Sequence, residues 1–259
     1  MIFDCHTHIT DESGSYNVEF ADHAAGLGGM IVLARIGEDN RKVSELAAKF
    51  EKTVTFGFID PSSEKKPAEA VEKIARKAGC RGLVVYCGET AMHPCHSSAM
   101  VAFEAAQRLG LPIFFHNECW GETSVLDYTQ PVHLDELART FPQLKMIIGS
   151  MARPFYSQTL ELTSRHENVY GCLPIYPKRA WELYNTVISI FEAGAEDKIL
   201  FGSGYPDNNA KESIEALLGL KLAFSETNLP WVGSADLRKL YERDCIEVLG
   251  LSVSHQEGQ

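Results

Sequence analysis

The chain has 259 residues, 45% of them hydrophobic and 23% charged, which is the composition of a folded globular protein and not of a disordered one. It carries 24 Lys and Arg against 35 Asp and Glu, a formal net charge of −11, and no basic run offsets it locally. This charge argues against nucleic acid and anionic membrane surfaces as partners, and no apolar run approaches the ~20 residues of a membrane span.

The cysteines and the first residues indicate the compartment. The seven cysteines are an odd number, none belongs to a Cys-x-x-Cys pair, and several lie inside apolar runs, as buried reduced thiols do. Met1 leads directly into the strand-like stretch Ile2–Cys5, without the charged segment and long apolar core of a signal peptide. We therefore expect free thiols and a cytoplasmic protein.

Short apolar runs and segments with helical spacing alternate along the chain. The runs are rich in β-branched or aromatic residues and have the length of buried parallel strands. In chain order they are Ile2–Cys5, Met30–Arg35, Val54–Ile59, Gly82–Cys87, Pro112–His116, Met146–Ser150, Val169–Leu173 and Ile199–Ser203. The helical segments are Arg41–Phe50, Ala68–Ala78, Ser98–Leu109, Leu134–Phe141, Thr159–Arg165, Ala180–Ala193, Lys211–Phe224 and a final Ala235–Leu249.

This alternation predicts parallel strands joined by crossover helices. Eight such units in about 250 residues match a single (β/α)8 TIM barrel, which we expect over residues 1–251, followed by a polar tail at 252–259. An open doubly wound sheet would carry a glycine-rich phosphate turn after its first strand. The chain has Cys5-His-Thr-His-Ile9 there, so the sequence favours the barrel.

Three histidines follow the ends of predicted strands, where the active site of a barrel lies. His6 and His8 are two residues apart, so in extended backbone both imidazoles point the same way, and His116 ends the fifth run. Three imidazole nitrogens suit a zinc ion, which keeps a position open for water and lowers the pKa of that water to about 7. The alternative is a chance pairing of histidines in a loop.

A second group, His93-Pro-Cys-His96, places a cysteine and two histidines within four residues. We expect it to be a loop and a helix start, since Pro94 limits its geometry and no fourth metal ligand is evident from the sequence.

Other mechanisms lack their usual residues. No predicted strand ends in Lys, which disfavours a Schiff-base aldolase and a binuclear centre bridged by a carboxylated lysine. No Gly-x-Ser-x-Gly follows a strand, which disfavours a serine hydrolase. A mononuclear metal centre is the most natural prediction.

Four segments resemble the amidohydrolase superfamily, in particular its amidohydrolase-related, ACMSD-like branch. They are Phe3-Asp-Cys-His-Thr-His8, Leu109–His116, Phe141–Ile148 and Lys198–Pro206, and the resemblance spans nearly the whole chain. It implies a barrel of the metallo-dependent hydrolase type with a divalent metal, zinc in our expectation, on His6, His8 and His116. It also implies hydrolysis, or as an alternative nonoxidative decarboxylation, of a small carboxylated or cyclic substrate.

The resemblance fails at two positions. The family's sixth strand usually delivers a histidine where this chain has Ser150, and its eighth strand usually delivers a proton-shuttling aspartate where this chain has Gly204. A barrel that has lost catalysis and binds a small molecule is therefore a second hypothesis.

Three residues are candidates for the missing roles. Glu118, two residues beyond His116, and Asp207, three beyond Gly204, are candidate catalytic residues, with a loop residue or a helix cap as the alternative. Arg153 is a candidate for binding a substrate carboxylate, with a salt bridge at the barrel rim as the alternative.

The remaining expectations are less specific. A weaker hypothesis is a metal-free enzyme that uses Cys87 or Glu118, while Glu89 leaves the fourth strand beside Cys87. The expected partner is a small-molecule substrate, and the sequence leaves a homo-oligomer open.

Overall fold

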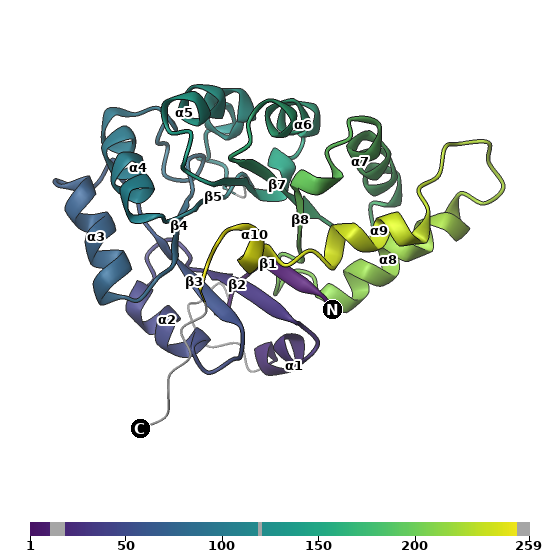
Figure 1. Cartoon of the computed structure of the whole chain (residues 1–259), viewed down its shortest axis with the longest axis horizontal. Helices are drawn as coiled ribbons and strands as arrows, with labels where there is room; N and C mark the ends of the chain where they lie inside the picture. Colours follow the sequence, from purple (N-terminus) through teal and green to yellow (C-terminus); the bar gives the residue numbers. More distant parts are fainter. Residues whose placement is uncertain (11–18, 119–120, 253–259) are drawn as a thin grey trace.

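The computed structural model of the chain describes residues 1–10, 19–118 and 121–252. Its eight strands form one sheet in the order β1 to β8, and every neighbouring pair is parallel (Figure 1). The strands are β1 Phe3–Thr7, β2 Gly29–Leu33, β3 Thr53–Phe58, β4 Gly82–Val85, β5 Ile113–Phe115, β6 Met146–Ile148, β7 Val169–Pro174 and β8 Ile199–Gly202. All eight predicted strands are therefore confirmed, with ends that shift by at most two residues.

Most of the helices surround these strands on the outside (Figure 1). They are α1 Phe20–Ala25, α2 Asn40–Ala47, α3 Pro67–Lys77, α4 Ser97–Leu109, α5 Leu134–Thr140, α6 Tyr156–Arg165, α7 Ala180–Glu192, α8 Ala210–Ala223, α9 Ser234–Tyr241 and α10 Cys245–Val248. Four short 3-10 helices are η1 Leu126–Thr129, η2 Pro131–His133, η3 Gly149–Ala152 and η4 Glu196–Lys198.

The first and last strands meet and close the barrel. Thr7 forms a parallel bridge with Tyr205, the His8 amide donates to the Tyr205 carbonyl at 2.9 Å, and the Gly204 amide donates to the His6 carbonyl at 2.9 Å. A closed ring with helices outside is the predicted (β/α)8 TIM barrel, and it excludes the open sheet.

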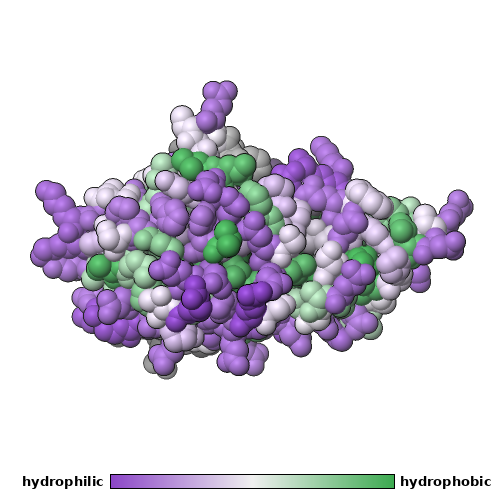
Figure 2. Space-filling view, turned by 90° about the horizontal axis from the view of Figure 1, so that it is seen from above, coloured by the Kyte–Doolittle hydropathy of each residue, from purple (hydrophilic) through white to green (hydrophobic). Residues whose placement is uncertain are grey.

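The base of the barrel is sealed by α10. Its Cys245 and Ile246 pack with side chains that fill the barrel interior, among them Phe56, Phe114 and Leu200. Larger apolar clusters lie between the strands and the outer helices. The face seen in Figure 2 is mostly hydrophilic with separate hydrophobic areas, as expected when the core is enclosed.

Two helix predictions differ from the structure. The expected helix Ala235–Leu249 is two helices, because the Asp244 side chain accepts hydrogen bonds from the amides of Ile246 and Glu247 and starts a new helix there. Helix α1 was not predicted, since its six residues bury only Phe20 and give almost no periodic signal.

Some expectations concern residues that the structure does not describe. Residues 253–259 of the predicted tail and Cys119 lie outside the described part. The six described cysteines are free, as predicted. None of the described helices has the length and apolar character needed to cross a membrane.

Candidate metal centre

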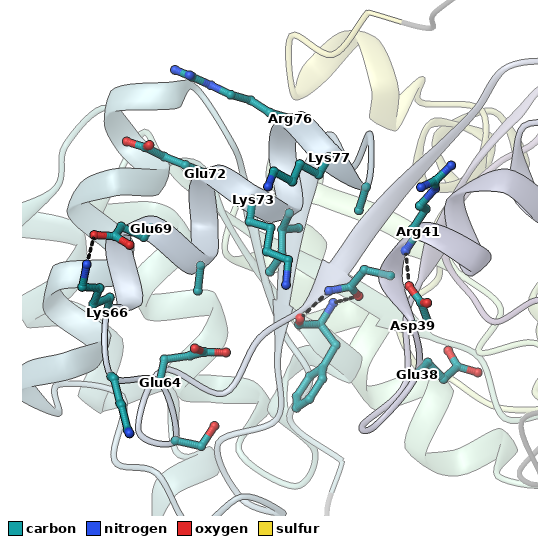
Figure 3. Close-up of a pocket in the computed structure, with 17 residues that line it drawn as sticks. Glu38, Asp39, Arg41, Glu64, Lys66, Glu69, Glu72, Lys73, Arg76 and Lys77 are labelled. Atoms are coloured by element: carbon teal, nitrogen blue, oxygen red, sulfur yellow. Dashed lines mark hydrogen bonds and ion pairs between the residues drawn. The ribbon is translucent and has the colours of Figure 1, made fainter.

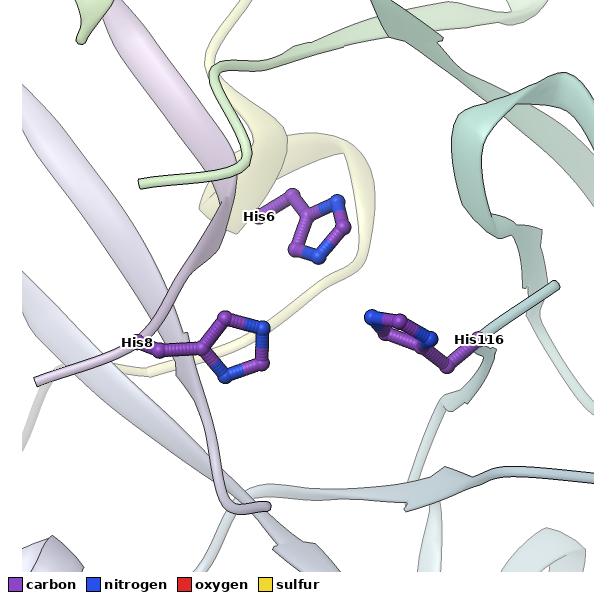
Figure 4. A group of neighbouring side chains, drawn as sticks. All are labelled: His6, His8 and His116. Carbon is purple, nitrogen blue, oxygen red and sulfur yellow. The ribbon is translucent and has the colours of Figure 1, made fainter. Parts of the chain in front are cut away.

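The three predicted histidines converge at the barrel mouth (Figure 4). Their ring centroids lie 5.3 Å (His6–His8), 5.1 Å (His6–His116) and 5.9 Å (His8–His116) apart. One ligand nitrogen from each ring lies within 4.8 Å of those of the other two, and all three residues are buried. β1 and the end of β5 therefore bring three imidazoles to one point.

The surroundings fix the orientation of these rings. His8 Nδ1 donates to the Leu33 carbonyl at 2.9 Å, which leaves its Nε2 for a metal ion. His116 Nδ1 is buried and has no hydrogen-bond partner within the described residues. A buried imidazole nitrogen without a partner is unfavourable unless something else binds it, so this site fits a divalent ion.

A glycine on β8 provides the room for His6. A Cβ atom at Gly202 would lie 2.7 Å from the Cβ of His6 and 2.4 Å from the Sγ of Cys172. Both distances are shorter than side-chain atoms tolerate, so only glycine at this position lets β8 pass His6 at this distance.

Electrostatics keep two of the histidines neutral. Burial, and then the charge of His6, lowers the pKa of His116 to about 3. Burial and the Arg35 charge hold the pKa of His8 well below its usual value. Burial opposes protonation of His6 as well, but contacts with the Cys172 thiol and the Glu118 charge outweigh it and raise the pKa of His6. Neutral imidazole is the form that binds metal.

Glu118 lies beside the histidines in a hydrogen-bonded network. Its carboxylate accepts hydrogen bonds from the hydroxyl of Ser150 and, at 2.7 Å, from that of Tyr176. Burial raises the pKa of Glu118, but His6, His116 and these two hydroxyls together lower it. The sequence suggested Glu118 but not its partners, which follow β6 and β7.

A small cavity of about 10 Å³ connects these groups. Its lining includes His6, Glu118, Tyr176, Gly204 and Asp207, so both candidate catalytic residues reach the same space as a predicted metal ligand. This volume is close to that of one water-sized probe.

Gly204, where the family's aspartate usually stands, has a φ of +69°, and a Cβ atom there would meet nothing within 4 Å. There is room for a side chain, but the left-handed backbone favours glycine.

Arg153 forms the rim salt bridge that was the alternative for this residue. Its Nε lies 2.5 Å from Oε1 of Glu182 on α7, and the same carboxylate also contacts Tyr156 and Arg179. The guanidinium stands 5.9 Å from the ring centre of Tyr176, whose hydroxyl donates to Glu118. Its role toward substrate stays a prediction, since a ligand carboxylate would have to compete with Glu182.

Two charged residues beside the site were not assigned a role from the sequence. Arg35 follows β2, and its Nε is buried without a hydrogen-bond partner within the described residues. Both carboxylate oxygens of Glu89, after β4, are likewise buried without such a partner. Burial, together with the Glu118 charge, raises the pKa of Glu89 to about 7. The sequence signal that could have pointed to both residues is their position just after the end of a strand.

Cys87 is poorly suited to nucleophilic chemistry. The residue is buried, and burial together with the charges of Glu89 and Asp60 raises the pKa of its thiol far above the usual range. A protonated thiol is a weak nucleophile, which does not favour the cysteine version of the metal-free hypothesis.

A much larger groove lies away from the histidines. It has a volume of about 1130 Å³ and runs between α2 and α3, where Figure 3 shows mostly charged side chains such as Lys73 and Glu69. None of the three histidines lines it, so its size alone does not make it the catalytic site.

The sequence and the fold both match known proteins. The model of the protein family described as Amidohydrolase matches residues 3–243 of this chain. A search of curated proteins gives no match.

Three solved structures illustrate the similarity in fold. An uncharacterized TIM-barrel protein from Bordetella bronchiseptica has 18% identity and a TM-score of 0.73, with 96% of this chain and 98% of that chain covered. An amidohydrolase from Burkholderia multivorans has 13% identity and a TM-score of 0.72, covering 97% and 100%. A dihydroxybenzoic acid decarboxylase from Polaromonas sp., with bound manganese and the inhibitor 2-nitroresorcinol, has 15% identity and a TM-score of 0.63, covering 96% and 96%.

Identities this low establish the fold alone. The sequence model, however, spans nearly the whole chain and includes the strand ends that carry His6, His8 and His116. The chain belongs to the amidohydrolase family.

Proposed function

We propose that this chain is a metal-dependent hydrolase that acts on a C–N or C–O bond of a small carboxylated or cyclic substrate. The observation that carries the proposal is the convergence of three buried imidazoles, one of which has an unpartnered Nδ1 within the described part of the chain. A divalent ion held by His6, His8 and His116 would supply Lewis-acid polarisation of a substrate oxygen and an activated water. Three nitrogen ligands favour zinc, and manganese, which one similar structure contains, is the alternative.

The residues around the histidines would divide the remaining work. Glu118 is the proposed proton acceptor, since two hydroxyl donors orient its carboxylate next to His6. Glu118 would take over the role of the aspartate that usually stands where this chain has Gly204. Asp207, which lines the same small cavity, is the second candidate for this role.

Arg35 would attract and orient a substrate carboxylate. Its buried Nε has no partner within the described residues, whereas Arg153 already pairs with Glu182, so we favour Arg35 for this role and keep Arg153 as the alternative.

Nonoxidative decarboxylation is the second candidate function. It is supported by the fold of the dihydroxybenzoic acid decarboxylase, and it needs a bound carboxylate near the metal in the same way. The third candidate, a binder without turnover, is supported by the loss of an acid at Gly204 and by the small cavity.

Metal analysis of protein purified without chelator tests the proposal. We expect His6→Ala with His8→Ala, and separately His116→Ala, to remove one equivalent of metal relative to wild type. His96→Asn is the matched control, because His96 is an exposed helix cap that asparagine can replace. Retention of that equivalent in both triad variants would reject the proposal.

Turnover separates the candidate functions. Dihydroxybenzoic acids report decarboxylation, and small lactones and cyclic amides report hydrolysis. Turnover that depends on His116 and Glu118 supports an enzyme, while metal binding without turnover of any compound supports the binder.

A further inference from the structure

A histidine outside the triad lies next to the backbone of the candidate metal centre. His23 belongs to α1, its side chain is only 3% exposed, and its Nε2 lies 3.5 Å from Oδ2 of the fully buried Asp4. It is the only basic side chain within ion-pair distance of Asp4 in the described part of the chain, where neither atom has a hydrogen-bond partner. A buried carboxylate oxygen that faces no donor is costly, so we assign the Nε2 proton of His23 to this contact.

The other oxygen of Asp4 holds the backbone of the site. Oδ1 accepts hydrogen bonds from the amides of His6 and Ser203. The carboxylate therefore contacts the first predicted metal ligand on one side and His23 on the other. Because the two oxygens belong to one planar group, a contact at Oδ2 restricts its rotation and keeps Oδ1 directed at the two amides.

The ring of His23 also contacts the segment that holds the second predicted ligand. It stacks on Tyr205, with centroids 4.2 Å apart and planes inclined by 24°. The carbonyl of Tyr205 accepts the amide of His8, and Tyr205 forms the parallel bridge with Thr7 that closes the barrel. His23 thus contacts both residues that fix the backbone of the two ligands on β1.

The alternative is that this imidazole only fills space. Phe20, on the same helix, already packs on Tyr205, with centroids 5.7 Å apart. A second apolar ring would serve packing at lower cost, because burial removes the nitrogens of an imidazole from water. The position of Nε2 opposite a buried carboxylate oxygen therefore favours a polar role for His23.

We propose that His23 is a positioning residue for the metal centre, which holds Asp4 and, through it, the backbone of His6. The inference rests on the proposed function in one respect, namely that the triad binds a metal ion. His23 is not a ligand itself, because the three nitrogens close enough to share an ion among the described residues belong to the triad. Its loss should therefore weaken metal binding without changing the number of ions bound.

A double-mutant cycle tests whether His23 acts through Asp4. His23→Phe keeps a ring against Tyr205 but removes the N–H group, and we expect zinc affinity, measured by competition with a chelator, to fall roughly 10-fold. In an Asp4→Ala background the same change should alter zinc affinity by less than about 2-fold, since the residue it acts on is gone. Unchanged affinity of the single variant, or full additivity of the two changes, would overturn the proposal.

A packing variant provides the matched control. Phe50 contacts the ring of Phe20 in the same apolar cluster, with centroids 5.0 Å apart, and makes no ring contact with His23 within the described residues. Phe50→Leu should lower Tm and leave zinc affinity unchanged. If it weakens zinc binding as much as His23→Phe does, loosened packing explains both effects and the proposal fails. Should His23→Phe not fold, His23→Leu, which also lacks the N–H group, takes its place.

Amide hydrogen exchange in the metal-free protein tests the contact without any metal. We expect His23→Phe to speed exchange of the His6 and Ser203 amides about 3–10-fold, the equivalent of one hydrogen bond. The amide of Leu83, which donates to the Pro112 carbonyl on the other side of the barrel, should be unaffected. Equal acceleration of all three amides, or of none, would overturn the proposal. A wild-type chain that binds no zinc would reject the proposed function, while the exchange rates would still decide the role of His23.

Discussion

Asp4 and Ser203 are joined across the closure of the barrel. The Oδ1 atom of Asp4 accepts the Ser203 amide at 3.0 Å and also the amide of His6 at 3.1 Å. One buried carboxylate thus ties the end of β8 to the backbone of His6, the first predicted metal ligand. The carboxylate that marks the family's opening motif holds the backbone of the site in place.

Removing this carboxylate should affect both stability and metal binding. Asp4→Ala would leave two buried amides unpaired, at about 1–3 kcal/mol each, whereas Asp4→Asn keeps an acceptor oxygen. We expect Asp4→Ala to lower the free energy of unfolding in urea and to weaken metal binding at the triad. Equal metal affinity in Asp4→Ala and wild type would show that Asp4 does not position His6.

Gly202 gives a steric test of the site. Gly202→Ala places a methyl group against Cys172 and His6, so we expect a loss of about 1–3 kcal/mol of stability and of metal from the triad. The control is Gly219→Ala on α8, where a Cβ meets nothing within 4 Å and where alanine should stabilise the helix by about 0.5–1 kcal/mol. Urea unfolding measures the stability of both variants, and elemental analysis measures their metal content. A Gly202→Ala variant with the stability and metal content of wild type would contradict the prediction.

Glu89 predicts a pH dependence of stability. Its pKa rises to about 7 in the folded protein from an ordinary value near 4.5, so the folded state binds the proton more tightly. The resulting stability is complete below the unfolded pKa and is lost as pH rises through about 7. The free energy of unfolding of Glu89→Gln, relative to that of wild type, should therefore increase from pH 5 to pH 8. We expect an increase of about 1–2 kcal/mol after allowance for solvent screening. A difference in free energy of unfolding between Glu89→Gln and wild type that is the same at pH 5 and at pH 8 would contradict this prediction.

Two histidines of the triad, His8 and His116, predict the opposite trend in acid for the metal-free protein. The pKa of His116 is lowered to about 3 and that of His8 lies well below its usual value, so the unfolded chain takes up protons first as pH falls below about 6.5. Stability should fall by about 1.4 kcal/mol per pH unit for each of them. His116→Gln should show a shallower decline between pH 6.5 and pH 4 in urea unfolding.

The position of the missing acid can be tested by moving it. Glu118→Gln should abolish turnover while it leaves metal content unchanged. Adding Gly204→Asp, which has space for its Cβ, should restore part of that turnover. Full activity of Glu118→Gln alone would instead assign the proton transfer to another residue, with Asp207→Asn as the next variant to measure.

The sequence predicted the barrel and the three histidines because both follow from local patterns. Strand ends in a parallel barrel face the same mouth, so His6, His8 and His116 had to meet. The contacts of Glu118 could not be predicted in the same way. They depend on how the chain turns after β6 at Ser150, which has a left-handed φ of 47°, and on where the segment after β7 places Tyr176.

Long-range pairings of helices and loops were also beyond the sequence. The salt bridge of Arg153 depends on which face of α7 presents Glu182, and periodicity does not fix the rotation of one helix against another loop. The contact between His93 and His133 likewise joins two loops whose conformations come from turns and 3-10 helices.

The plug formed by α10 has a consequence for how the chain acquires its structure. The interior of the barrel begins with Phe3 on β1, yet it is completed by Cys245 and Ile246, and Lys145 donates to the carbonyl of Val248 at 2.8 Å. Residues from opposite ends of the described chain thus share one core. During synthesis, that core stays open to water until α10 has left the ribosome, and a chain cut before residue 245 would leave the lower end of the barrel uncovered.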